Sequence, residues 1–200
     1  LLPNATTYGV NVGISSSAAG TLYAQTANLA PTEIAASVSG WGFLKLGLWS
    51  EGGSSQIGSV QVTLTGDAPS AGVSASVYKE NNGNASFEPG PDIQLGDQYF
   101  NGPAVQVELG TQTITGTTQY FYIALDYAAI PPGRQIGVSI ADPSHLRMIS
   151  GSLDGSAAFP LASNLSLVRT GMAARPYDPN RPYDQNYPVP TGGASPNGGF

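Results

Sequence analysis

The sequence predicts an all-β protein, an antiparallel β-sandwich of the immunoglobulin-like or jelly-roll type with an extended Pro- and Tyr-rich C-terminal arm. Three observations support this prediction. Apolar residues alternate with polar ones in short runs, which is the period of a strand with one buried face. The runs recur at the 8–12 residue spacing of sandwiches. Only 10% of the 200 residues are charged, and no helical pattern of 10–15 residues separates the runs.

The chain divides into three parts by composition. Residues 1–20 form an N-terminal strand and a joint, residues 21–174 the sandwich, and residues 175–200 the arm. Two hundred residues are enough for one domain with a buried core.

The N-terminal strand is expected at residues 7–15, which read TYGVNVGIS. Tyr8, Val10, Val12 and Ile14 share one face, and the small residues 15–20 follow them. A terminal strand on such a joint has two possible partners. It pairs within its own sandwich, or it is donated to the sheet of a neighbouring subunit.

Further strands follow along the chain. Residues 41–49 place three leucines on one face and Trp41, Phe43 and Trp49 on the other, which predicts a central strand or one whose outer face is covered. A short helical turn is expected to begin at Pro31. The remaining strands are expected at 59–65, 73–78, 104–109, 119–127, 135–141, 145–149 and 164–169.

A loop rich in oxygen-bearing side chains follows the strand that begins at Val73. Such residues at alternate positions can supply the six to eight oxygens that calcium prefers. The candidate metal ligands are Glu80, Asn82, Asn84, Glu88 and Asp92. The alternative is a solvated hairpin loop that binds no metal.

Residues 77–92 resemble the strand-plus-acidic-loop units of secreted bacterial and archaeal β-sandwich surface domains, which read roughly D-x-N-x-N-G-x-F-D-x-G-D. The resemblance implies a surface or filament-subunit domain with a degenerate calcium-type loop. The chain departs from the pattern at two positions: Glu80 replaces the leading Asp, and Ala85 stands where such loops prefer Gly.

Three Asn-x-Ser/Thr sequons make Asn4, Asn84 and Asn164 candidate glycosylation sites. A glycan and a metal ion on Asn84 would exclude each other. The sequence starts at Leu1, and its first Met is Met148. We therefore expect an extracellular or cell-surface location after removal of an N-terminal signal.

The arm contains a six-residue repeat, RPYDPN at 175–180 and RPYDQN at 181–186. Proline at this density favours polyproline II, in which Tyr177 and Tyr183 fall on the same edge. With Tyr187, these rings are candidates for packing on a neighbouring subunit. A plain linker is the alternative.

The sequence favours a protein that is not an enzyme. It contains no cysteine and a single histidine, His145, and it has no G-x-S-x-G elbow, HExxH or phosphate loop. The net charge of −6 argues against nucleic acid as a partner. The sequence contains no run of 18 apolar residues, so membrane insertion is not expected.

The expected function is therefore that of a structural subunit of an extracellular filament or cell-surface assembly. Its partners would be copies of itself, joined by strand donation and arm contacts, with no cofactor other than calcium. The alternative is a secreted module that binds carbohydrate or another ligand. Its binding surface would be formed by exposed aromatic residues at Trp41, Trp49, Tyr120 and Tyr122.

Overall fold

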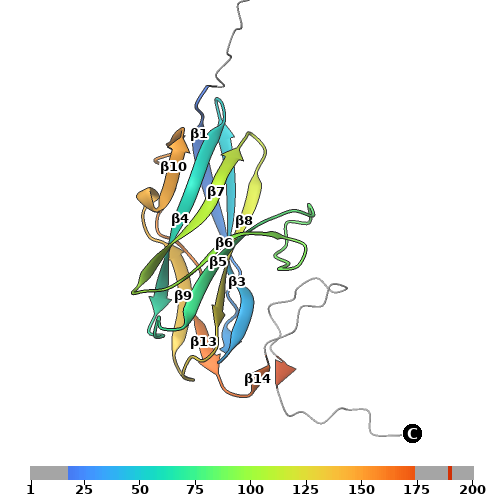
Figure 1. Cartoon of the computed structure of the whole chain (residues 1–200), viewed down its shortest axis with the longest axis vertical. Coiled ribbons are helices and arrows are strands. Elements are labelled where there is room, and N and C mark those ends of the chain that lie inside the picture. Colours follow the sequence, from blue (N-terminus) through green and yellow to red (C-terminus); the bar gives the residue numbers. More distant parts are fainter. Residues whose placement is uncertain (1–17, 174–188, 191–200) are drawn as a thin grey trace, which may run out of the picture.

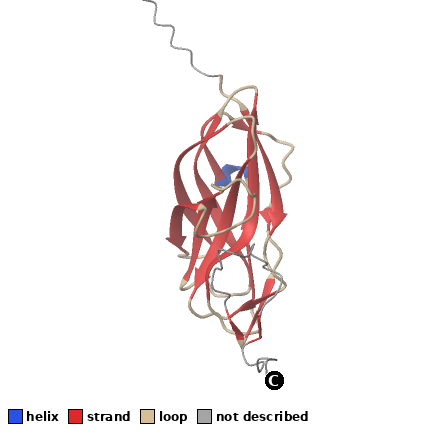
Figure 2. Cartoon of the chain, turned by 90° about the vertical axis from the view of Figure 1, so that its right-hand side faces the viewer, coloured by secondary structure: helices blue, strands red, loops and turns tan. Residues whose placement is uncertain are grey.

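The computed structural model describes residues 18–173 and 189–190. These residues form two layered β-sheets with one short 3-10 turn at Pro143–His145, so the prediction of an all-β sandwich is confirmed at this level. The strands run close to the long axis of an elongated body (Figures 1 and 2). None of the helices in the described part is long and apolar enough to cross a membrane.

The first sheet has six strands in the spatial order β11-β1-β3-β8-β5-β6. All neighbours in it are antiparallel except the short pair β11 and β1. Its strands are β1 (Thr21–Asn28), β3 (Val38–Glu51), β5 (Val73–Lys79), β6 (Ile93–Tyr99), β8 (Gln119–Tyr127) and β11 (Ser152–Leu153).

The second sheet has the order β10-β4-β9-β13-β2, with β7 on β4 and β12 on β9. Its strands are β2 (Glu33–Ala35), β4 (Ser55–Gly66), β7 (Ala104–Ile114), β9 (Gln135–Ile140), β10 (Leu146–Ser150), β12 (Leu161–Ala162) and β13 (Ser166–Arg169). A separate two-stranded ladder joins β14 (Met172–Ala173) to β15 (Val189–Pro190).

Period-2 alternation accounts for the core between the sheets. Phe121, Ile123 and Leu125 of β8 are at most 1% exposed, and they lie in one cluster with the leucines of β3. As predicted, β3 is a central strand, with β1 on one side and β8 on the other.

Two expectations about local structure were wrong. The segment beginning at Pro31 forms the short strand β2 rather than a helical turn, because Ile34 is buried and β2 pairs with β13 in parallel. Phe43 lies in the core beside Leu44, not opposite it. An irregularity in the β3–β8 register between Gly42 and Leu44 shifts the alternation at this point.

The two ends of the sandwich chain lie at opposite ends of the body. The chain enters β1 at the upper end of the body in Figure 1, and β14 lies at the lower end. The predicted strand 7–15 lies outside the described residues, as do residues 175–188 and 191–200 of the arm.

Candidate functional site

The candidate site lies on the outer face of the first sheet, where residues 80–92 fold back from the end of β5. We call this segment the acidic loop; it is the green loop at the right of Figure 1. Phe87 anchors it. Its ring is 3% exposed and lies 5.1 Å from that of Tyr78 and 5.3 Å from that of Tyr122. With Ala124 these three rings form a small apolar cluster outside the main core, which we call the outer cluster.

Glu80 begins the acidic loop and organises its first turn. One carboxylate oxygen accepts hydrogen bonds from the backbone N–H groups of Asn82 and Gly83, both at 2.9 Å. The other accepts from the hydroxyl of Tyr122 at 2.8 Å. Burial and this bond to a carboxylate raise the pKa of Tyr122, so the phenol stays a donor.

Asp92 closes the acidic loop from its far end. The residue is 5% exposed, and its carboxylate accepts from the N–H of Glu88 at 2.8 Å and of Asn81 at 3.3 Å. Burial raises the pKa of Asp92, and the neighbouring charge of Glu80 acts in the same direction. The carboxylate therefore ties the start of the loop to its end.

Glu88 lies between the two asparagines that were predicted as its fellow ligands. Its Oε2 accepts from the side-chain amides of Asn82 and Asn84, the latter at 3.1 Å. The five predicted metal ligands thus belong to one hydrogen-bonded loop. Within the described residues, no group of three or more His, Cys, Asp or Glu side chains is arranged to hold a metal ion.

Lys45 of β3 joins the acidic loop to the sheet. Its Nζ donates to the backbone oxygen of Ala85 at 2.5 Å and lies 3.9 Å from the centre of the Tyr120 ring. Burial lowers the pKa of Lys45, while the charge of Glu80 opposes this shift. No pattern in the sequence predicts this contact, because Lys45 and Ala85 are 40 residues apart.

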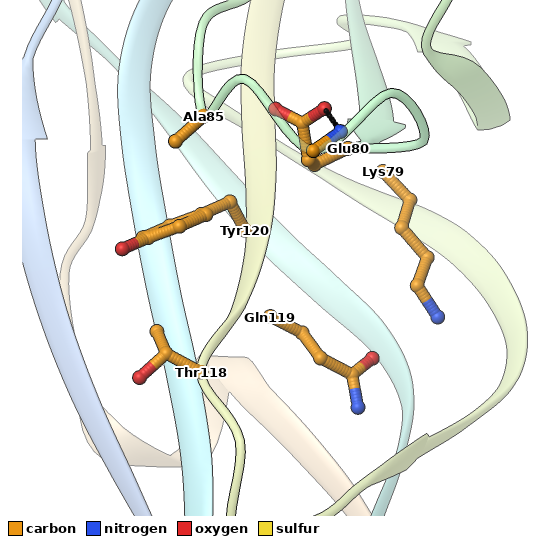
Figure 3. Close-up of a pocket in the computed structure, with 7 residues that line it drawn as sticks. Lys79, Glu80, Ala85, Thr118, Gln119 and Tyr120 are labelled. Carbon is orange, nitrogen blue, oxygen red and sulfur yellow. Dashed lines mark hydrogen bonds between the residues drawn. The ribbon is translucent and has the colours of Figure 1, made fainter.

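Two hollows flank Tyr120. One, of about 280 Å³, is lined by Lys79, Glu80, Gly83, Ala85, Thr118, Gln119 and Tyr120. The other, of about 250 Å³, is lined by Gln25, Thr26, Ala27, Lys45, Gly47 and Tyr120. In Figure 3 the ring of Tyr120 lies between Ala85 and Thr118, while Lys79 and Gln119 extend to its other side. Tyr120 therefore forms a ridge between two hollows of mixed polar and apolar lining.

The aromatic surface differs from the one expected from the sequence. Trp41 is 6% exposed and lies in the main core, and Tyr122 is covered by Phe87, so neither forms a free surface. Trp49 is half-buried and stacks on Tyr23 of β1, with ring centres 5.4 Å apart. Tyr120 and Trp49 remain at the outer surface.

The sequons have different surroundings. Asn84 is exposed, and its side chain is bonded within the acidic loop. Asn164 is exposed too, but Ser166 of its sequon is fully buried and donates to the backbone oxygen of Pro31 at 2.6 Å. Asn4 lies outside the described residues.

The remaining predicted assembly residues, Tyr8, Val10, Val12, Ile14, Tyr177, Tyr183 and Tyr187, also lie outside the described residues. The comparisons with known proteins give no further assignment. No protein-family model matches the chain, and no curated protein matches its sequence.

Proposed function

We propose that this protein is a non-catalytic structural subunit of an extracellular filament or cell-surface assembly. Copies of the chain would join head to tail, through donation of strand 7–15 and through contacts of the arm. The observation that carries the proposal is where the N-terminal and C-terminal segments are attached to the sandwich. The segments that precede β1 and follow β14 are attached at opposite ends of an elongated sandwich (Figure 1).

This arrangement suits polymerisation. A contact that joins different surfaces of two subunits does not close on itself unless the rotation allows a ring, so it extends into a filament. Segments at opposite ends of the body supply two such different contacts. Strand 7–15 has a strictly one-sided apolar pattern, and the arm repeats an Arg-Pro-Tyr-Asp unit.

Electron microscopy of the purified protein and of native material tests the proposal. We expect filaments or ordered sheets whose formation depends on protein concentration. Monodisperse monomers at all concentrations, with the same result for native material, would contradict it.

The contribution of the arm is tested by a deletion. Removal of 175–200 takes away Tyr177, Tyr183 and Tyr187, and with them the proposed stacking and cation–π contacts. We expect weaker assembly of a protein that still folds, because the part of this segment that the structure describes is only β15, with its short ladder to β14. The matched control keeps the full length and replaces the three tyrosines with serine. Unchanged assembly of both variants would mean that the arm does not contribute to assembly.

Calcium and glycans have structural roles in this proposal. A cation in the acidic loop would stabilise the fold by about 2.7 kcal/mol at a hundredfold excess over its dissociation constant. Melting with calcium and with a chelator measures this effect, and identical melting temperatures would leave a loop without a metal. Mass spectrometry of native material tests for glycans at Asn4, Asn84 and Asn164.

A second candidate function, binding of a carbohydrate or another small ligand, is favoured by the ridge at Tyr120. An aromatic ring between two hollows lined with Gln, Thr and Lys side chains offers both a stacking surface and hydrogen-bonding groups. Tyr120→Ala should abolish binding in a glycan screen. The control Tyr99→Ala removes a ring that is 66% exposed on β6, and it should leave binding unchanged.

A further inference from the structure

We propose that the outer edge of β1 at residues 24–27 is the acceptor for strand 7–15 of a neighbouring subunit. This inference rests on the proposed function and names the surface on which the donated strand would lie. The partner is a second copy of this chain. The structural feature that identifies the edge is the way in which β11 covers only the beginning of β1.

The hydrogen bonds to β11 reveal which backbone groups of β1 face outward. The backbone oxygen of Gly20 accepts from Ser152 at 3.1 Å, and that of Leu22 accepts from Asp154 at 2.7 Å. Backbone groups alternate in direction along a strand, so those of Ala24 and Thr26 point to the same edge. The β11 register ends at Leu22, and among the described residues no strand pairs with β1 beyond it on this side.

The edge therefore presents unpaired N–H and C=O groups at Ala24 and Thr26. Such an edge is a template for an added strand. Residues 25–28 are exposed. At the end of this stretch β12 approaches β1, and the N–H of Asn164 donates to Oδ1 of Asn28 at 2.7 Å, so the open part of the edge is at Ala24 and Thr26. The other edge of β1 is fully engaged, because residues 21–28 pair with β3 along their whole length.

The side chains around the edge match a strand with one apolar face. Core-facing Ala24 is partly exposed and packs against the main core. Leu153 and Phe159, from the segment that runs past this side of the sandwich, are also partly exposed apolar residues on that core. An added strand at β1 would direct alternate side chains toward them. Tyr8, Val10, Val12 and Ile14 have this spacing.

The position of residue 18 favours a neighbouring copy over the same chain. A tight hairpin would lay residues 12–15 beside the start of β1, where β11 already occupies the edge. The free stretch begins six residues after Ala18, about 20 Å further along the strand. Only the first part of segment 7–15 could reach it, with residues 13–17 drawn out past β11.

Cysteine cross-linking tests the proposal directly, because the chain contains no cysteine. The full-length double variant Val12→Cys with Thr26→Cys is oxidised after assembly and run on a non-reducing gel. Donor and acceptor cysteines on different copies should link successive subunits into a ladder. Each single variant should give dimers at most. The scan includes Tyr8, Val10 and Ile14 as donor positions to find the register.

The matched control combines Val12→Cys with Gln106→Cys, an exposed position on β7 in the other sheet. We expect no ladder from it. An equal ladder from this control would reject the β1 edge as the acceptor. The same conclusion would follow from no ladder at any donor position while wild-type filaments form. Neither result would contradict the proposed filament function. A cross-link within single chains would reject donation to a neighbour. Absence of wild-type assembly would instead reject the proposed function itself.

A proline variant gives a second measurement that does not depend on the cysteines. Thr26→Pro removes an N–H that faces outward, which is the position where an edge strand tolerates proline. We expect at least a tenfold loss of polymer while the melting curve shows a folded protein. Thr26→Val keeps the N–H and should assemble like the wild type. Equal assembly of both variants would overturn the proposal.

Discussion

The main core and the outer cluster bury aromatic residues in two different ways. In the main core, Phe121 is surrounded by side chains that alternate along several strands of both sheets. In the outer cluster, Tyr122 of the same strand packs against Phe87 of the acidic loop, and its hydroxyl donates to Glu80 of that loop. The burial of neighbouring residues of β8 therefore depends on both sheets on one face and on the acidic loop on the other.

The largest effect is expected from the main core. Phe121→Ala removes a ring that is 1% exposed, and the loss of transfer energy together with the cavity should cost about 3–5 kcal/mol. This is a large part of the stability of an ordinary domain, so urea unfolding should show a greatly lowered midpoint or an unfolded protein. A cost below about 1 kcal/mol would mean that this side of β8 is not the core.

Phe87→Ala should cost less, about 2–3 kcal/mol, because its ring contacts one small cluster and the loop can relax. The loss should be local. We expect faster amide exchange and proteolysis at residues 80–92, with the unfolding slope m unchanged. Phe87→Leu is the control, since it keeps an apolar side chain and should retain most of the protection. A uniform loss of protection from amide exchange across β3 and β8 would show that the outer cluster unfolds together with the whole domain.

This contrast explains how much of the structure could be predicted from sequence. The bounds of β8 were predicted as observed, since strong apolar alternation fixes both its ends and its buried face. Strand β6 was missed, because it is an exposed edge strand whose residues alternate too weakly to give a signal. The burial of Tyr122 was also missed. A period-2 pattern shows which residues share a face of a strand, but it does not show whether a loop covers that face. Phe87, which packs on Tyr122, is 35 residues away in the chain.

The acidic loop shows the same limit at the level of single contacts. Alternating Asn, Ser and Glu residues predicted that these side chains gather, and they do share one hydrogen-bonded network. Which oxygen accepts which N–H depends on the path of the backbone. The contact between Lys45 and Ala85 depends further on how the loop docks on the sheet. Neither follows from spacing along the chain.

A smaller effect, and one that depends on pH, is expected at Asp92. Because burial raises its pKa in the folded state, the folded protein binds this proton more tightly than the unfolded chain does. The stability contributed by Asp92 should therefore increase as the pH falls from 7 through the raised pKa. It should stop changing below the ordinary value of 3.8.

Asp92→Asn provides the reference, since it removes the titration but keeps one acceptor oxygen. At pH 7 it should cost roughly 1–2 kcal/mol, because one of the two bonds to backbone N–H groups is lost. The advantage of the wild type over this variant should widen on acidification. Urea unfolding of both proteins at a series of pH values measures the difference. A narrowing would show that the two N–H bonds outweigh burial and lower the pKa.

The smallest expected effect is a gain in stability at Ala85. Among the described residues it is the only one other than glycine with a positive φ, at 56°, a conformation that costs a residue with a Cβ about 1–2 kcal/mol. Glycine adopts this conformation without that cost. Ala85→Gly should relieve this strain but lose part of the gain to the greater freedom of glycine in the unfolded chain. The net gain should be up to about 1 kcal/mol in urea unfolding. Ala158→Gly, at an exposed loop position with no positive φ, should be neutral or destabilising. Equal losses from both substitutions would mean that the positive φ of Ala85 stores no strain that glycine can relieve.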